Sequence, residues 1–491
     1  MIKLLADLRS AGIVRRRSIP GEQALDSLDA LVIVADAAAA PAHSKLPDTP
    51  YMRTLWQQSQ ASPGQIVPGR LGAAGRARVF LLTAPQTAGT FDYLQQAGTV
   101  LRDVATARPA RMGLVVLARE PAPWFEALLA AALAQSFALP QWRRQSEPAW
   151  RLERVELFGA PALPLRRIAA TARAGNLVRW LTAMPPNLLD ATGYRKLLGQ
   201  LARRHGLRLR WYSQAALQRL GAGAFLAVAR SNPRRDAGIA RLSWGRRGAR
   251  PDVALVGKGI TFDTGGINLK PHRSMLDMHT DMSGSAVALA SLIALSELDS
   301  PLAAEAWLAI TENNTGPDAY RPQEVVQALN GTTIQVIHSD AEGRMALADT
   351  LSLAARTRPK LMLDFATLTG TCVYALGERY SGVFSTRPEL AAKLVAAGAA
   401  SGERVWSFPM DADYDQELRS SVADVLQCTV DSHADHILAA RFLSRFVPKD
   451  IPWAHVDLSA ATRKGGLGAV GTDVTGFGAR LTLQLLLAGR P

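Results

Sequence analysis

Two short segments of this 491-residue chain hold most of the residues that could do chemistry. The segment 339–344 reads Ser-Asp-Ala-Glu-Gly-Arg, and the segment 256–284 mixes aspartates and lysines with glycines. Carboxylates this close together repel each other unless a cation lies between them. We therefore expect a hydrolytic metal centre that both segments build. Its candidate residues are Lys258, Asp263, Lys270, Asp281, Asp340, Glu342 and Arg344.

Buried strands are expected to position these side chains. The runs 253–257, 333–337 and 361–366 are short and rich in apolar residues, which is typical of buried strands. In open α/β sheets, ligands bind outside the carboxyl ends of the strands. Side chains at such strand exits can therefore converge on one site. The residues expected at strand exits are Lys258, Asp263, Asp340, Glu342 and the segment 367–370.

The whole chain is expected to fold as an α/β protein with two domains. Residues 1–160 alternate short apolar runs with helical spacing, which predicts an N-terminal α/β domain. It carries no evident chemistry, and we expect a scaffold or oligomer contacts. A linker helix over 161–187 leads into 188–491. There, helices over 283–296 and 345–355 would flank the central mixed sheet of a catalytic α/β domain.

Composition favours a soluble globular protein, since 48% of the residues are hydrophobic and 20% are charged. No apolar run approaches the roughly 18 residues that span a membrane. Charged residues interrupt the first ten positions, which therefore lack the apolar core of a signal peptide. Cys372 and Cys428 form no CxxC pair. We expect a cytoplasmic protein with reduced thiols.

The net charge of +14 is distributed unevenly along the chain. Residues 166–254 hold 18 Lys and Arg against three Asp and Glu, whereas residues 255–491 hold 20 against 26. A basic block can bind nucleic acid, or it can be a solvated arginine-rich surface. We favour the surface. Because no helix-turn-helix or other reading module is evident, at most weak, non-specific nucleic-acid binding is expected through 166–254.

In this order and spacing, the motifs resemble those of the leucyl aminopeptidase (cytosol aminopeptidase) family of two-metal exopeptidases. The resemblance runs through most of 166–491 and is densest over 256–284 and 334–351. It implies an enzyme that hydrolyses the N-terminal peptide bond of peptides with a free α-amine, using a water activated by two metal ions. It also implies a homohexamer.

The resemblance further implies a role for each candidate residue. One metal ion would take Lys258, Asp263, Asp281 and Glu342, and the other would take Asp263, Asp340 and Glu342. Lys270 would polarise the scissile carbonyl, and Arg344 would hold a bicarbonate ion that acts as the general base. Oxygen-rich ligation with one nitrogen suits Mn²⁺ or Zn²⁺, with Co²⁺ a third option. The residues that would line the substrate are Met278, Thr367, Leu368 and Gly370.

The chain departs from the family pattern in two places. His338 and Ser339 stand where the family usually has Asn-Thr, and 431–437 replaces a glycine-rich segment at the rim of the site. Substrate preference and assembly are left open by these departures. Two other functions are alternatives: a DNA-binding regulator with or without peptidase activity, and a catalytically silent relative. Retention of every ligand position argues against the silent relative.

Overall fold

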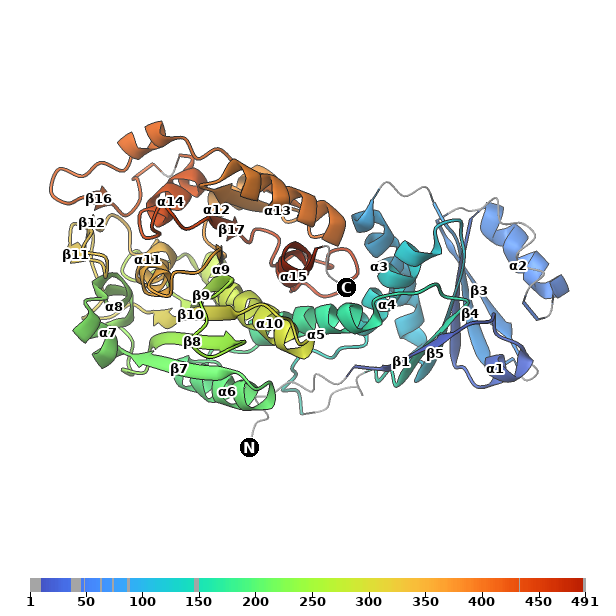
Figure 1. The fold of residues 1–491 in the computed structure, drawn as a ribbon. Helices are drawn as coiled ribbons and strands as arrows, with labels where there is room; N and C mark the ends of the chain where they lie inside the picture. Colours follow the sequence, from blue (N-terminus) through green and yellow to red (C-terminus); the bar gives the residue numbers. More distant parts are fainter. Residues whose placement is uncertain are drawn as a thin grey trace.

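The computed structural model describes residues 10–36, 46–47, 49–61, 64–72, 75–85, 89–144, 150–431 and 433–488. Two large sheets organise them, one in the N-terminal part and one in the C-terminal part of the chain. Figure 1 shows the two units side by side, the first in blue and the second from green to red. Both sheets carry helices on their two faces, so the expected α/β class is confirmed.

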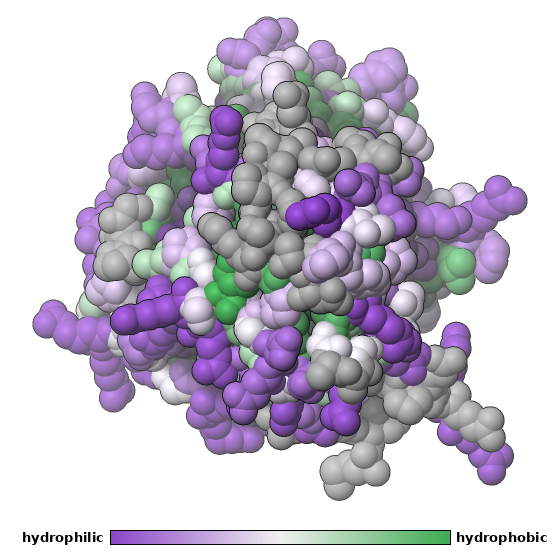
Figure 2. All heavy atoms as spheres, turned by 90° about the vertical axis from the view of Figure 1, so that its right-hand side faces the viewer, coloured by the Kyte–Doolittle hydropathy of each residue, from purple (hydrophilic) through white to green (hydrophobic). Residues whose placement is uncertain are grey.

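The N-terminal unit is built on a six-stranded sheet of order β1-β6-β5-β2-β4-β3, in which only β3 runs antiparallel to its neighbour. Val32 packs with helices α3 and α4, whereas Leu31 and Ile33 pack with α1 and α2. Hydrophilic side chains surround a smaller apolar area on the outer end of this unit (Figure 2). The strands are β1 (Gly12–Arg16), β2 (Ala30–Ala35), β3 (Ile66–Leu71), β4 (Ala77–Thr83), β5 (Arg111–Leu117) and β6 (Arg154–Phe158), and the helices are α1 (Glu22–Asp26), α2 (Thr49–Ala61), α3 (Thr90–Ala107) and α4 (Pro121–Gln135).

The C-terminal unit is built on an eight-stranded mixed sheet of order β15-β14-β17-β13-β9-β10-β8-β7. The central strands β17, β13, β9 and β10 are parallel, and β14 and β8 run antiparallel to them on either side. The expected central mixed sheet is therefore present. Its strands are β7 (Arg208–Ser213), β8 (Gly238–Trp244), β9 (Val253–Asp263), β10 (Ala304–Asn313), β13 (Met362–Ala366), β14 (Ser381–Ser385), β15 (Val405–Ser407) and β17 (Trp453–Asp457).

Two helical layers bury the faces of this sheet. Along β10, Leu308 and Ile310 pack into one apolar cluster, and Trp307 and Ala309 pack into the other. This alternation follows the two-residue period of a strand. The first cluster holds α5 (Leu165–Thr182), α6 (Ala191–Arg204), α10 (Ser283–Glu297), α13 (Pro388–Ser401) and α15 (Ala479–Leu487), and the second holds α7 (Gln214–Leu220), α8 (Gly223–Ala229), α11 (Glu342–Ala355) and α14 (Asp435–Ser444).

The helix expected as a linker is α5, and it is packed rather than extended between the units. It contacts α4 of the first unit and α10 and α15 of the second. Asn176 and Arg179 donate hydrogen bonds to the carbonyls of Leu133 and Ala134 in α4, at 3.0 and 2.8 Å. The domain boundaries at 160 and 187 stay a prediction. None of the helices in the described part of the chain combines the length and apolar composition needed to cross a lipid bilayer.

Two expectations about strands need correction, the first in part. The run 333–337 does not join the large sheet: only β12 (Thr333–Gln335) forms, and it pairs with β11 (Val325–Gln327) and β16 (Val425–Leu426) in a small separate sheet. Likewise, β9 does not end at Gly257 but continues to Asp263, so Lys258 lies inside a strand. Gly257 makes room for α10 instead, because a Cβ there would lie 2.4 Å from the carbonyl oxygen of Gly284.

Candidate metal centre

Three elements bring the candidate side chains to one point. Strand β9 carries Lys258 and Asp263 on the stretch that extends beyond its pairing with β13. Asp281 follows a one-turn helix (η2, Met278–Thr280) directly before α10. Glu342 is the first residue of α11, and Asp340 lies two residues before it. Helices α10 and α11 are buried on opposite faces of the sheet, and this packing fixes both helix starts relative to β9.

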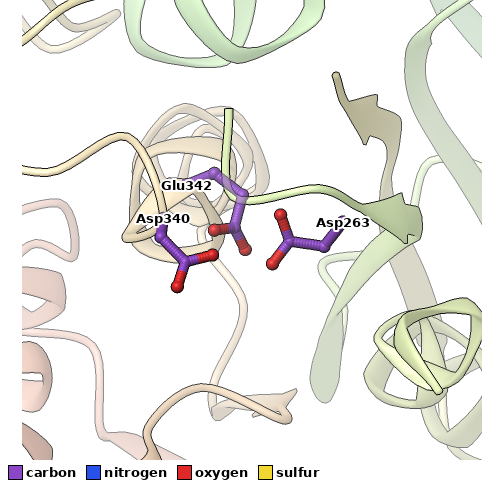
Figure 3. Close-up of side chains that lie close together, drawn as sticks. All are labelled: Asp263, Asp340 and Glu342. Atoms are coloured by element: carbon purple, nitrogen blue, oxygen red, sulfur yellow. The ribbon is translucent and has the colours of Figure 1, made fainter. Parts of the chain in front are cut away.

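Three of the carboxylates converge closely. Asp263, Asp340 and Glu342 each offer an oxygen atom, and these atoms all lie within 4.8 Å of one another. Figure 3 shows the three groups turned toward one another, Asp263 from strand β9, Glu342 from the first residue of α11 and Asp340 from the loop directly before that helix. Asp263 and Glu342 are buried, and Asp340 is half-buried. Mutual repulsion would oppose this arrangement in the absence of positive charge.

Lys258 supplies part of that positive charge from the buried side. Its Nζ lies 2.8 Å from Asp281 Oδ2 and 2.8 Å from Glu342 Oε1, and it donates a hydrogen bond to the carbonyl of Thr367 at 3.1 Å. A Cβ on Gly343 would lie 2.7 Å from this nitrogen. Glycine at position 343 therefore leaves the space that the lysine fills.

Lys270 contacts the other side of the cluster. Its Nζ lies 2.9 Å from Asp263 Oδ2 and 2.5 Å from Asp340 Oδ1. Together the two lysines face four carboxylates, so the cluster keeps an excess of formal negative charge. Two divalent cations would reverse that excess.

The pKa values in this cluster are strongly perturbed. Burial, as the largest cause, raises the pKa of Asp281, Asp340 and Glu342 above the ordinary range of carboxyl groups. For Lys258, burial acts to lower the pKa, but the surrounding carboxylates, Asp281 first among them, raise it overall. Several perturbed groups in one place are typical of functional sites.

The donor atoms fit divalent metal ions. Among the described residues, Glu342 Oε2 is buried and has no hydrogen-bond partner, and an orphaned carboxylate oxygen is costly to bury. Carboxylate oxygens with one amine nitrogen and no thiolate match the donors of Zn²⁺, Mn²⁺ or Co²⁺.

Asn313 positions the cluster, and sequence reasoning missed it. Its Nδ2 donates to Asp263 Oδ1 at 2.7 Å and to the carbonyl of Ser339 at 3.1 Å, so one amide ties β10 to both acidic segments. Ser339 also donates from its hydroxyl to the carbonyl of Gly265 at 2.7 Å. Ser339 departs from the family pattern, but it still links the second acidic segment to the first. In the sequence, the one indication that Asn313 has a role in the site is its position at the end of an apolar strand.

The expected substrate residues lie around the start of α12 (Gly370–Leu376). Thr367 donates from its hydroxyl to Asp281 Oδ1 at 2.7 Å and is thereby part of the centre. Leu368 donates its backbone N–H to Asp457 Oδ1 at 3.1 Å, and Gly370 is exposed as the first residue of α12. Met278 is half-buried in the one-turn helix that precedes Asp281.

Arg344 pairs with a carboxylate that is not one of the four in the acidic cluster. It is only 2% exposed, its Nη2 lies 2.7 Å from Asp435 Oδ2, and its Nη1 donates to the carbonyl of Gln427 at 3.2 Å. Asp435 belongs to the segment 431–437 that departs from the family pattern; within it, Ser432 lies outside the described residues. The sequence marked this segment as unusual, but no spacing rule connected it to an arginine 91 positions earlier.

Known proteins match both this sequence and this fold. A sequence model described as the cytosol aminopeptidase family, catalytic domain, matches residues 176–483. A probable cytosol aminopeptidase of Syntrophotalea carbinolica is 37% identical over 404 residues, which cover 80% of this chain and 78% of that protein. The chain belongs to the cytosol aminopeptidase family.

Solved structures are similar to this family member over the N-terminal unit as well as the C-terminal one. The bottromycin maturation enzyme BotP in complex with Mn is 31% identical, with a TM-score of 0.81 over 94% of this chain and 99% of that one. The cytosol aminopeptidase from Coxiella burnetii is 25% identical, with a TM-score of 0.81 over 98% and 99%. A tomato leucine aminopeptidase mutant, at 24% identity and a TM-score of 0.84 over 98% and 97%, shares the fold.

Membership of the cytosol aminopeptidase family confirms the resemblance seen in the sequence. The chain is a leucyl-type aminopeptidase, a hydrolase of peptide bonds. The family match and the relatives support this activity and give no support to the alternative of a DNA-binding regulator.

Proposed function

We propose that this aminopeptidase removes the N-terminal residue of peptides with a free α-amine by means of two divalent metal ions. The observation that carries the proposal is the convergence of Asp263, Asp340 and Glu342 within 4.8 Å beside two lysines. The manganese-bound structure of BotP supports it. When bound, a metal pair lowers the pKa of a water molecule towards about 7 and polarises the carbonyl oxygen of the substrate.

The chain's own residues divide the ligation between them. As the resemblance implies, one ion would be held by Lys258, Asp263, Asp281 and Glu342, and the other would be held by Asp263, Asp340 and Glu342. The Lys258 nitrogen must lose its proton before it can act as a ligand. Mn²⁺ and Zn²⁺ are the proposed ions, with Co²⁺ as a third option.

Lys270 has the position of a charge that acts on the substrate. It is the less enclosed of the two lysines, and its ammonium lies on the Asp340 side of the cluster. Burial acts to lower its pKa, but Asp263, Glu342 and Asp340 raise it overall, so the group stays protonated. A fixed ammonium stabilises the negative charge that develops on the carbonyl oxygen.

The remaining roles complete the proposal. Thr367, Leu368 and Gly370 would contact the substrate backbone, and Met278 would border the side-chain pocket. The enzyme would act as a cytoplasmic homohexamer, with N-terminal units contributing contacts. For Arg344, the resemblance implies a bicarbonate ion as the general base, whereas the structure places the Asp435 carboxylate on this guanidinium.

A matched pair of peptides tests the exopeptidase activity. One peptide has a free N-terminus and the other has the same sequence with an acetylated N-terminus, and both are assayed with Mn²⁺ or Zn²⁺. The acetylated peptide lacks a basic amine that can hold its first carbonyl in place. Because a misplacement of about 1 Å can cost around a hundredfold in rate, we expect cleavage of the free peptide alone. Equal cleavage of both, or cleavage inside the acetylated chain, would contradict the proposal.

A further inference from the structure

The Arg344 guanidinium is buried next to the acidic cluster and has one anionic partner among the described residues. Asp435 Oδ2 accepts from Nη2 at 2.7 Å, and the neutral carbonyl of Gln427 accepts from Nη1. The guanidinium carries further donors, of which Nε is buried without a hydrogen-bond partner. A guanidinium binds the planar O–C–O fork of a carboxylate or a bicarbonate ion in the same way.

Asp435 is held firmly in this position. It is the first residue of α14, and the next residue, His436, anchors the helix start to Thr371 through its backbone N–H at 3.0 Å and its ring Nδ1 at 3.2 Å. The His436 ring also packs edge-on against Phe408, with ring centroids 4.6 Å apart. The contact with Arg344 is therefore made from an anchored helix start.

The second carboxylate oxygen of Asp435 is free to accept a hydrogen bond. Oδ1 is buried, and the described part of the chain offers it no hydrogen-bond partner. The carboxylate thus has one oxygen on the guanidinium and one free acceptor oxygen. A tethered carboxylate also has a high effective concentration compared with a dissolved anion.

We propose that Asp435 is the built-in oxyanion of the Arg344 site, so that this aminopeptidase needs no bicarbonate or other small oxyanion there. Asp435 acts through Arg344 as a positioning residue in the reaction that the proposed function describes. The departure at 431–437 from the glycine-rich family pattern supplies this carboxylate. Glycine has no side chain and could not fill the site.

The wild-type enzyme gives the first test. Peptidase activity is measured in buffer freed of carbon dioxide and again after adding bicarbonate at constant ionic strength. We expect the two rates to agree within about twofold, because Asp435 already supplies the anionic partner of the guanidinium. A several-fold stimulation of the wild-type enzyme by bicarbonate would overturn the proposal.

Removing the carboxylate gives the second test. We expect Asp435→Ala to lose about 10- to 100-fold in kcat and to regain much of it with formate or bicarbonate, in a saturable way that chloride does not reproduce. Asp435→Asn should not be rescued, because its amide still fills the space. The control is Asp415→Ala, which removes the carboxylate that pairs with Arg441 of α14. This variant should not respond to formate. Full activity of Asp435→Ala without added anion would overturn the proposal.

A binding measurement separates this proposal from the proposed function. The metal-free Asp435→Ala protein should melt at a higher temperature as formate or bicarbonate is added, because the anion binds the folded state alone. The metal-free wild-type protein and the Asp415→Ala control should not shift. This readout needs no peptidase activity, so it stands even if the assay conditions give no turnover. An Asp435→Ala protein whose melting temperature and activity both ignore these anions would refute the assignment.

Discussion

Lys258 and Lys270 contact the same acidic cluster but differ in their surroundings. Lys258 is enclosed by Asp281, Glu342 and the carbonyl of Thr367, so its removal leaves buried carboxylates without a counterion. Lys270 reaches the cluster from a less buried loop and contacts Asp263 and Asp340. At the scale of single residues, this difference supports the proposed roles of the first lysine as a metal ligand and of the second as a charge that faces the substrate.

This difference predicts a specific behaviour for Lys270→Ala. We expect the variant to retain its metal ions and to lose about 100- to 1,000-fold in kcat, with a smaller change in KM, because a charge that acts on the transition state is lost. The measurements are steady-state kinetics and metal analysis. Lys360→Ala removes an exposed lysine paired with Asp252 and serves as the control. Loss of metal from Lys270→Ala would instead show that Lys270 holds the site together.

At the scale of elements, α11 carries much of the site. Its first turn presents Glu342 and Arg344, and every residue of the helix is buried. Asp349 lies farther along α11 and accepts hydrogen bonds from the backbone N–H groups of Phe225, in α8, and Leu329, at 2.8 and 2.7 Å. This carboxylate therefore fixes α11 against two neighbouring segments.

Asp349 makes the stability of the protein depend on pH. Burial raises its pKa from 3.8 to about 7, although the backbone hydrogen bonds act in the opposite direction. The folded chain then binds the proton more tightly than the unfolded chain. The stability from this group is fully present below its unfolded pKa and is lost as the pH rises through about 7, by no more than about 4 kcal/mol in total.

The comparison of wild type with Asp349→Asn by urea unfolding at pH 5 and pH 8 checks this prediction. Asparagine does not titrate, and its side-chain NH₂ group cannot accept a hydrogen bond. One of the two backbone N–H donors therefore loses its acceptor, which costs about 1–3 kcal/mol of stability at both pH values. We expect the stability advantage of the wild type to be larger at pH 5 than at pH 8. An advantage that does not change between the two pH values would mean that the proton is not bound in the folded state.

Much of this element-level arrangement was predictable, and the exceptions have physical causes. Helices α10 and α11 and strand β13 follow from runs of small and apolar residues, because elements packed on or inside a sheet are buried along their whole length. The length of β9 was not predictable, because glycines that look like a strand end serve close packing against α10. The acidic cluster followed from charge spacing, and the proposed ligand roles followed from the family resemblance. Asn313 and Asp435 instead act through contacts that only the folded chain creates.

At the scale of the whole molecule, part of the basic block at 166–254 lies at one edge of the large sheet. A groove beside β7 and β8 is lined by arginines, with Glu305 as an acidic residue already paired with Arg241. The arginines that line it are Arg208, Arg210, Arg241, Arg246, Arg247, Arg250 and Arg358. Such a surface attracts polyanions without reading their sequence.

Nucleic-acid binding at this groove should be weak and strongly salt-dependent. We expect fluorescence anisotropy with labelled duplex DNA to show a log affinity that falls by about 0.9 per phosphate contact for each tenfold rise in salt. The double variant Arg246→Gln, Arg247→Gln should reduce this slope and leave peptidase activity unchanged. Tight, sequence-selective binding at physiological salt would contradict this prediction and favour the regulator.

In the proposed function, Glu342 holds two divalent metal ions together with Asp263 and Asp340, and hydrolysis depends on these ions. The most direct measurement is metal content per chain, determined alongside activity for the wild type, for Glu342→Gln and for Glu305→Gln. The last variant is a control that alters another buried glutamate, one paired with Arg241. We predict two ions per chain in the wild type and in the control. In Glu342→Gln we predict a parallel loss of metal and of activity, the latter by at least about a hundredfold. Two bound ions and full activity in Glu342→Gln would contradict the proposed two-metal centre.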